Sequence, residues 1–104
     1  MNGYDIDGVL VPRKVVPVHP FIVISGRKIH EWRRTLEQLN EAIGEHPPAV
    51  YLRPSGRDGD PVSAGIWKAA VINLANVTTF FEDDPIQAKI IAERCPSCLV
   101  HLVN

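Results

Sequence analysis

Four polar signatures follow or lie between apolar runs in this chain, and their residue types suit the binding of a divalent cation and a phosphoryl group. They are YDIDGVL at residues 4–10, FIVISGR at 21–27, Lys68, and TFFEDDP at 79–85. Carboxylates are preferred oxygen ligands of Mg²⁺. Hydroxyl, guanidinium and ammonium groups can bind phosphoryl oxygens. If the fold brings the four signatures together, they predict a site for a metal ion and a phosphate ester.

The elements that position these residues can be read from the apolar pattern. Five short runs rich in β-branched or aromatic residues predict strands: Tyr4–Ile6, Phe21–Ile24, Val50–Leu52, Thr79–Phe81 and Leu99–Val103. Apolar residues at three- and four-residue steps predict three helices, on Ile29, Trp32, Leu36, Leu39 and Ile43, on Ile66, Ala70, Ile72 and Leu74, and on Ile86, Ile90 and Ile91. Pro85 suits the first turn of the last helix.

The alternation of strands and helices predicts the fold class and the place of the chemistry. We expect an α/β three-layer sandwich with a five-stranded, mostly parallel, Rossmann-like sheet. In such sheets the carboxyl ends of the strands meet at one edge, where ligands bind. All the acidic and hydroxyl groups of the signatures should gather there.

The size and net charge of the chain limit the classes of function that it can have. The 104 residues suit one domain, and a 45% hydrophobic content supports a core. The formal net charge of −1 provides no global attraction for nucleic acid or an anionic membrane, so an anionic substrate must be held by a local cluster. No apolar run approaches the roughly 20 residues that span a bilayer, and no signal peptide is recognisable, so we expect a cytoplasmic protein.

Each signature also has a simpler interpretation. Asp5 and Asp7 would point the same way on a regular strand, but an Asp-Gly pair also makes a turn at a strand end. Gly8 permits a turn that bends Asp7 over Asp5. Ser25 could be a helix N-cap, a phosphate ligand, or both, since free N–H groups at a helix start bind phosphate. Arg27 adds a bidentate donor.

The later signatures are equally ambiguous when taken alone. Three adjacent acids at Glu82–Asp84 indicate either a solvated loop or a Mg²⁺ site. A lone lysine such as Lys68 is most often a solvated surface residue. Cys95 and Cys98 form CPSC near His101, but a structural zinc site needs four ligands and the chain has no second cysteine pair. We therefore expect ordinary thiols.

Taken jointly, the signatures resemble those of the haloacid dehalogenase superfamily over nearly the whole chain. Its pattern is DxDGx[TV] after the first strand, an apolar strand ending in Ser or Thr, a downstream Lys, and an acidic pair after the fourth strand. The matching residues are Asp5, Asp7, Ser25, Asp83 and Asp84. The pattern is closest to that of the phosphatase domain of bacteriophage polynucleotide kinase, whose second motif also reads SGR and whose third helix also carries a Trp-Lys pair.

The chain departs from this pattern at the lysine and in the first strand, which has only Met1–Tyr4 before Asp5. Lys68 lies nearer to the acidic pair than the third-motif lysine usually does. Glu82 stands where many members have Gly, so Asp83 rather than Glu82 is the expected metal ligand. The positions at which members insert cap domains hold only the short loops Val11–Pro20 and Pro54–Ala64. We therefore expect residues 1–104 to form a single, minimal haloacid dehalogenase-like domain without a cap.

The resemblance implies a Mg²⁺-dependent phosphohydrolase. Asp5 would attack phosphorus to give an aspartyl-phosphate, and Asp7 would act as general acid and then base. Mg²⁺ would lie between Asp5, the backbone carbonyl of Asp7, and Asp83, with Asp84 in support. The phosphoryl oxygens would be bound by the remaining matched residues, Ser25, Gly26, Arg27 and Lys68.

The sequence defines the substrate less closely than the reaction, and it leaves two alternative functions open. Arg27, Arg53 and Arg57 suit phosphates at an open rim. Together with the resemblance to the polynucleotide kinase phosphatase, they favour a nucleotide or the end of an oligonucleotide as substrate, with a large substrate or a homo-oligomer completing the uncapped site. One rival is a catalytically weak phosphate- or metal-binding module. Another is a receiver domain, but its acidic pair comes first and its phosphorylated aspartate lies mid-chain, unlike the order here.

Overall fold

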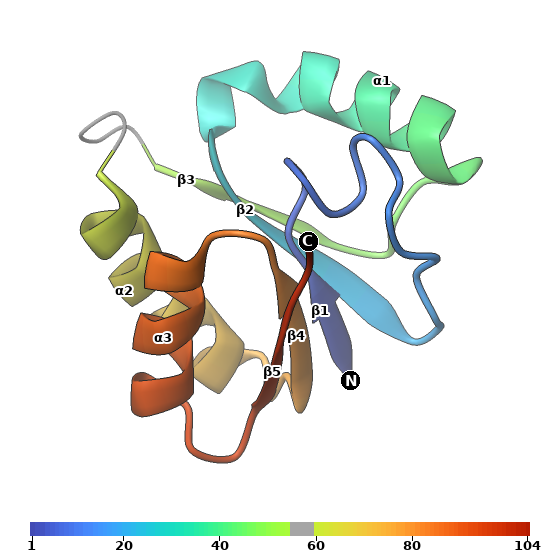
Figure 1. Cartoon of the computed structure of the whole chain (residues 1–104). Helices are drawn as coiled ribbons and strands as arrows, with labels where there is room; N and C mark the ends of the chain where they lie inside the picture. Colours follow the sequence, from blue (N-terminus) through green and yellow to red (C-terminus); the bar gives the residue numbers. More distant parts are fainter. Residues whose placement is uncertain (55–59) are drawn as a thin grey trace.

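The computed structural model describes residues 1–54 and 60–104. Within them, one parallel sheet has the strand order β3-β2-β1-β4-β5 (Figure 1). Its strands are β1 (Asn2–Tyr4), β2 (Phe21–Lys28), β3 (Val50–Arg53), β4 (Thr79–Glu82) and β5 (Leu99–Leu102). The helix α1 (Trp32–Ile43) covers one face, and α2 (Pro61–Leu74) and α3 (Pro85–Arg94) cover the other. This is the predicted three-layer, Rossmann-like α/β fold.

The strand order reverses between β1 and β4, and the residues that follow these two strands border a crevice at their carboxyl ends. The chain leaves β1 toward β2 and β3 on one side, and α2 then returns it to β4 on the other side of β1. Ligands of open α/β sheets bind at such a reversal, outside the carboxyl ends of the strands. In register, Tyr4 lies opposite Phe81, so Asp5 and Glu82 follow at the same level.

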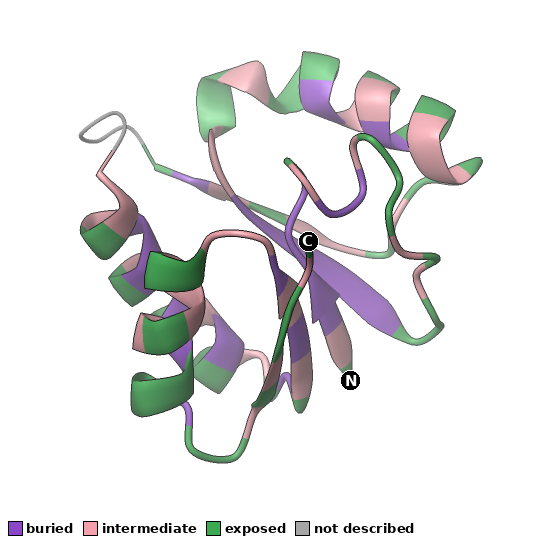
Figure 2. Cartoon of the chain, viewed as in Figure 1, coloured by how far each residue is buried: buried purple, intermediate pink, exposed green. Residues whose placement is uncertain are grey.

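Two apolar clusters lie on the two faces of the sheet. Figure 2 shows that the buried residues are concentrated along the central strands β1 and β2. The cluster on the side of α2 and α3 consists of Ile22, Ile24, Ala69, Ile72, Val77, Phe80, Ile91 and Cys95. The cluster on the side of α1 consists of Tyr4, Ile6, Val9, Leu10, Phe21, Val23 and Leu39. The alternation along β2 between the two sets is the period of two expected of a strand buried on both faces.

The first strand is short but firmly held. Tyr4 stacks on Phe81 with ring centroids 4.7 Å apart, and its hydroxyl accepts a hydrogen bond from the N–H of Val18. Gly3 allows close contact with β4, because a Cβ there would lie 2.8 Å from Cδ1 of Phe80. These contacts fix the strand end from which Asp5 projects.

Two strands, β1 and β2, differ from the predicted ranges by more than one residue, and the other three by a single residue at the carboxyl end. β1 ends at Tyr4 rather than Ile6, because the chain turns at once: the N–H groups of Val9, Leu10 and Val11 all donate to the carbonyl of Ile6. β2 continues to Lys28, since its pairing with β3 resumes at Arg53 after an irregularity. Ser25 therefore lies inside a strand, and the helix N-cap interpretation of Ser25 is wrong.

The buried faces of the helices also differ in part from the predicted ones. In α2, Ile66, Ala70 and Leu74 are exposed although their spacing predicts a buried stripe, whereas Ile72 is buried as expected. The buried side consists of Ala64, Gly65, Lys68, Ala69 and Ile72. In α1 the prediction holds for Leu39 but not for Trp32, which is 49% exposed. Pro85 begins α3, as predicted. No described helix is both long and apolar enough to cross a membrane.

Candidate functional site

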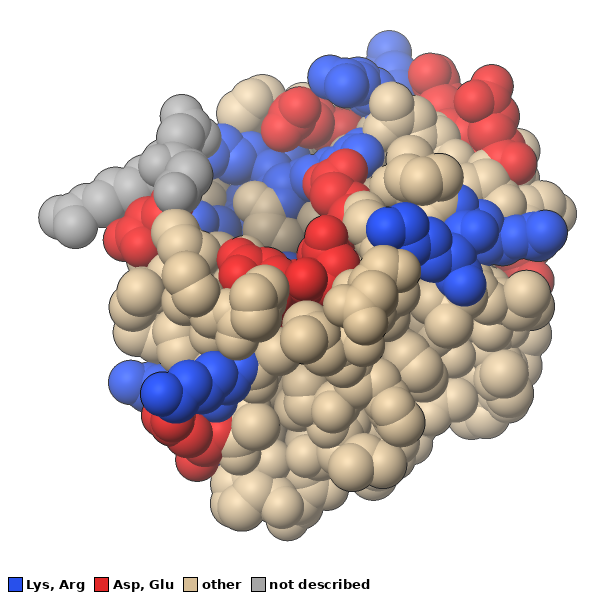
Figure 3. All heavy atoms as spheres, in the orientation of Figure 1, with Lys and Arg blue, Asp and Glu red and all other residues tan. Residues whose placement is uncertain are grey.

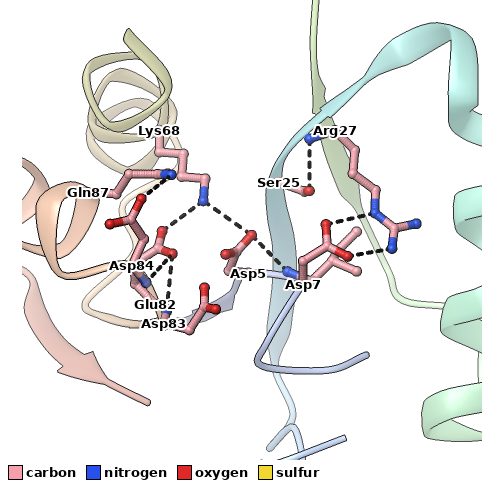
Figure 4. Close-up of polar contacts among 10 residues, drawn as sticks. Asp5, Asp7, Ser25, Arg27, Lys68, Glu82, Asp83, Asp84 and Gln87 are labelled. Atoms are coloured by element: carbon pink, nitrogen blue, oxygen red, sulfur yellow. Dashed lines mark hydrogen bonds and ion pairs between the residues drawn. The ribbon is translucent and has the colours of Figure 1, made fainter. Parts of the chain in front are cut away.

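Asp5 is held at the floor of the crevice between β1 and β4. It follows β1 directly and is 5% exposed. Its N–H donates to the carbonyl of Phe81, and its Oδ1 accepts from the N–H of Ile6 at 2.8 Å. The same oxygen lies 3.2 Å from Nζ of Lys68 (Figure 4). One carboxylate oxygen is thus fixed by the backbone and by a cation.

Lys68 is buried and reaches the crevice from α2. Its side chain is 2% exposed, and Nζ lies 2.7 Å from Oε1 of Glu82. The small residue Gly65 permits this position of α2, because a Cβ there would lie 3.3 Å from the Cα of Gln87 in α3. Burial alone would lower the pKa of Lys68, but Asp5 and Glu82 more than compensate, so the pKa is raised and the ammonium form is stable.

Glu82 ends β4 beside this pair, and Asp83 follows it. Oε2 of Glu82 accepts hydrogen bonds from the N–H groups of Asp83 and Asp84, at 3.1 and 3.2 Å. Glu82 therefore orients both Lys68 and the turn that carries Asp83. The carboxylate of Asp83 lies against Gly8, where a Cβ would overlap Oδ2 of Asp83 and where φ is +79°. Only glycine fits that position without strain.

The donor set at this end of the sheet fits a divalent cation. Carboxylate oxygens of Asp5, Glu82 and Asp83 lie within 4.8 Å of one another, and hard oxygen ligands of this kind suit Mg²⁺. Both oxygens of Glu82 already accept hydrogen bonds, which leaves Asp5 and Asp83 as the better ligands. This arrangement supports the preference for Asp83 over Glu82.

Negative charge is in excess at the site. Burial raises the pKa of Asp5 to about 7, with Lys68 lowering it and Glu82 raising it further. The pKa of Asp83 is also raised, first by burial and then by the charge of Asp5. A bound cation would oppose both effects, because it stabilises the ionised carboxylates.

Asp7 lies apart from this cluster. Its exposed carboxylate forms a bidentate ion pair with Arg27, with Nη2 2.7 Å from Oδ1 and Nε 3.0 Å from Oδ2 (Figure 4). This hydrogen bonding lowers the pKa of Asp7. Arg27 also donates to Gln38 at 2.5 Å. Asp5 and Asp7 would point the same way only on a regular strand, and this condition is not met, because β1 ends at Tyr4 and the chain bends at Ile6.

The other predicted residues lie close by. Ser25 is buried, and its Oγ accepts from the N–H of Arg27 at 3.0 Å. Asp84 caps α3: Oδ1 accepts from the N–H of Ile86 at 2.9 Å, and Oδ2 from Nε2 of Gln87 at 3.0 Å. Asp84 is not in the carboxylate cluster, so its part in metal binding stays a prediction.

A cavity of about 280 Å³ brings the predicted site together. It is lined by Asp5, Asp7, Ser25, Gly26, Arg27, Lys68, Asp83, Asp84 and Gln87. Figure 3 shows acidic and basic side chains around a hollow on this side of the molecule. Every residue assigned to catalysis, to the phosphoryl group or to the metal ion therefore lines one cavity, whereas Arg53, expected at the rim, lines a neighbouring one.

Sequence reasoning missed Gln87 and the central position of Glu82. Gln87 follows the N-cap Asp84 by three residues, which is the spacing of a capping box, and that signal could have identified it. Glu82 is two residues after the buried Phe80, so strand alternation places it inside. Arg57, expected at the rim, lies outside the described residues.

The cysteines match the simpler interpretation. Cys95 is buried and Cys98 half-buried, and both are free thiols. Within residues 1–54 and 60–104, they and His101 form no group that could hold a metal ion.

Comparisons of the chain with protein-family models, with curated proteins and with solved structures found no match.

Proposed function

We propose that this chain is a Mg²⁺-dependent phosphohydrolase that acts through an aspartyl-phosphate on Asp5, with nucleotides or oligonucleotide ends among its candidate substrates. The observation that carries the proposal is the meeting of Asp5, Lys68 and Asp83 at the point where the strand order reverses. This combines a fixed nucleophile, a buried cation and a second carboxylate. A solvated acidic loop would not need a buried lysine.

In the proposed reaction, an oxygen of Asp5 attacks phosphorus and the bond to the leaving oxygen breaks. Lys68 places its positive charge at the nucleophile, where it stabilises charge on the phosphoryl oxygens. The Ser25 hydroxyl offers a further hydrogen bond at the cavity wall. A divalent cation held by Asp5 and Asp83 would offset the negative charge of the carboxylates and of the phosphate ester.

Asp7 completes the proton transfers. As general acid it gives a proton to the leaving oxygen, and as general base it takes one from the water that hydrolyses the aspartyl-phosphate. Phosphate then leaves and Asp5 is regenerated. Asp7 must release Arg27 and take up a proton from solvent before it can act as the acid, and an incoming phosphate can compete for the guanidinium, which binds phosphate as well as carboxylate.

The test is hydrolysis of a chromogenic phosphate ester with Mg²⁺ and with EDTA. We expect turnover only with the cation, loss of turnover in Asp5→Asn, and wild-type turnover in Glu93→Gln, an exposed control on α3. Asp7→Asn should lose less with nitrophenyl phosphate than with an alkyl phosphate, because nitrophenolate needs little protonation. Metal-independent turnover, or an active Asp5→Asn protein, would refute the proposal.

One observation favours a second candidate, a phosphate- or metal-binding module with little catalysis. Asp7 is turned toward Arg27 rather than toward Asp5. The two candidates differ in a simple way: the module would bind inorganic phosphate in the presence of Mg²⁺ but would release none from esters.

A further inference from the structure

A second cavity adjoins the one that contains Asp5. It has a volume of about 360 Å³, and its lining residues are Gly26, Arg53, Asp60, Pro61, Ala64, Asp84 and Gln87. Three of them, Gly26, Asp84 and Gln87, line both cavities. A group bonded to a phosphoryl unit at Asp5 can therefore extend into the second cavity. Its volume is at the small end of ligand pockets.

Gln87 lines both cavities, and its side chain has an acceptor that no described group uses. Its Nε2 donates to Oδ2 of Asp84 at 3.0 Å, which orients the amide. Its carbonyl oxygen Oε1 is buried and accepts no hydrogen bond from the described part of the chain. A buried acceptor without a donor is unfavourable. A ligand O–H or N–H at this point would relieve that cost.

Arg53 and Asp60 provide a donor and an acceptor on the wall of the second cavity. Arg53 ends β3, is only 8% exposed, and donates from Nη2 to Oγ of Ser63 at 2.5 Å. Its guanidinium carries five N–H donors in all. Asp60 caps α2 through Oδ1, which accepts from the N–H groups of Val62 and Ser63. A carboxylate has further acceptor sites on its second oxygen.

This mixture of groups matches hydroxyls better than a base or a second phosphate. A hydroxyl both donates and accepts, so neighbouring hydroxyls can serve Gln87, Asp60 and Arg53 together. The described lining residues include no aromatic side chain on which a nucleobase could stack. Among the described lining residues, Asp60 and Asp84 outnumber Arg53, which disfavours a second anion there.

We propose that the second cavity binds the hydroxyl-bearing ring of the leaving group, a sugar with free vicinal hydroxyls. The assignment rests on the proposed phosphohydrolase function and specifies its substrate class. The same chemistry occurs in a free sugar phosphate and in the ribose of a nucleotide, so the experiment contains both.

The first readout is kcat/KM for two matched pairs that differ by one hydroxyl. One pair is ribose 5-phosphate and 2-deoxyribose 5-phosphate, and the other is adenosine 5′-monophosphate and its 2′-deoxy form. We expect the hydroxylated member to be preferred about tenfold in at least one pair, the value of one good hydrogen bond. The pair with the higher kcat/KM identifies the source of the sugar.

Variants of the second cavity test the assignment to these residues. Gln87→Met and Arg53→Met should bring the ratio of kcat/KM values within each pair toward one. Arg13 is exposed and lines neither cavity, so Arg13→Gln should leave this ratio unchanged. Gln87→Met is the more informative change, because Arg53 is buried and its loss can also lower stability. A preference near one in both pairs of the wild type, or an unaltered preference in Gln87→Met, overturns the assignment.

The second readout does not depend on turnover. Calorimetry with Asp5→Asn protein and Mg²⁺ measures binding of the same four compounds. A hydroxyl preference in binding without any wild-type hydrolysis would refute the phosphohydrolase and retain the sugar site. Hydrolysis with equal use of both members of each pair would refute the sugar site and retain the phosphohydrolase. Absence of both binding and hydrolysis would refute both.

Discussion

Replacing Lys68 with Met should strongly destabilise the protein, because it leaves buried carboxylates without their cation. Nζ of Lys68 lies 2.7 Å from Glu82 and 3.2 Å from Asp5, and all three side chains are at most 8% exposed. Removing one partner of a buried ion pair costs about 3–5 kcal/mol. This is a large part of a typical domain stability of ~5–15 kcal/mol. At roughly 4 °C per kcal/mol, Tm should fall by about 12 °C or more.

The loss should depend on pH in a defined direction. Lys68 lowers the pKa of Asp5, so the variant should have an Asp5 pKa above the wild-type value of about 7. A carboxyl whose pKa is higher in the folded than in the unfolded state binds protons preferentially when folded. Stability therefore falls as pH rises from the unfolded pKa toward the folded one. The variant should be least stable, relative to wild type, near pH 8 and closer to wild type near pH 5.

Thermal and urea unfolding in EDTA at the two pH values provide the assay. Lys89→Met, an exposed lysine on α3, is the matched control and should leave Tm unchanged. Lys68→Met with Glu82→Gln should recover part of the loss, because the second change removes one of the unpaired charges. Equal melting temperatures of Lys68→Met and Lys89→Met at pH 8 would refute the buried charge network.

Three further predictions concern the metal ion, Gly8 and Arg27. Mg²⁺ should raise the Tm of EDTA-treated protein with increasing concentration, and coincident melts at millimolar metal would argue against the cation site. Gly8→Ala should lower stability and weaken that Mg²⁺ response, because a Cβ displaces Asp83. Gly44→Ala, with a φ of +75° but nothing within 4 Å, is the control for backbone strain alone, and equal effects of the two would contradict the clash. Arg27→Met should raise the pKa of Asp7 toward the usual aspartate value, which a carbon-detected NMR titration would measure; an unchanged pKa would show that the ion pair is absent in solution.

The fold and the grouping of the site could be predicted because both depend on local pattern. Strand–helix alternation predicts a parallel sheet, and a parallel sheet brings the residues at or after the carboxyl ends of β1, β2 and β4 to one edge. Asp5, Ser25 and Asp83 meet for that reason. The order of these residues along the chain was sufficient to predict that they lie together, without knowledge of any single contact.

The orientation of individual side chains could not be predicted in the same way. The direction of Asp7 depends on a turn after Tyr4 and on Arg27, which lies 20 residues later. The burial of Lys68 depends on the packing of α2 against α3 at Gly65. The sequence around Lys68 is apolar on nearly all sides, so helical periodicity could not select the buried face. These features arise from tertiary packing.

The central claim is that Asp5 accepts a phosphoryl group, and trapping that adduct tests it most directly. Protein mixed with a phosphate ester and Mg²⁺ is quenched in acid within one turnover, and its peptides are analysed by mass spectrometry. We predict the mass of one added phosphoryl group on the peptide that contains Asp5 in the wild type, and none in Asp5→Asn. Release of phosphate with no adduct on Asp5, or an adduct on another residue, would contradict the proposed mechanism.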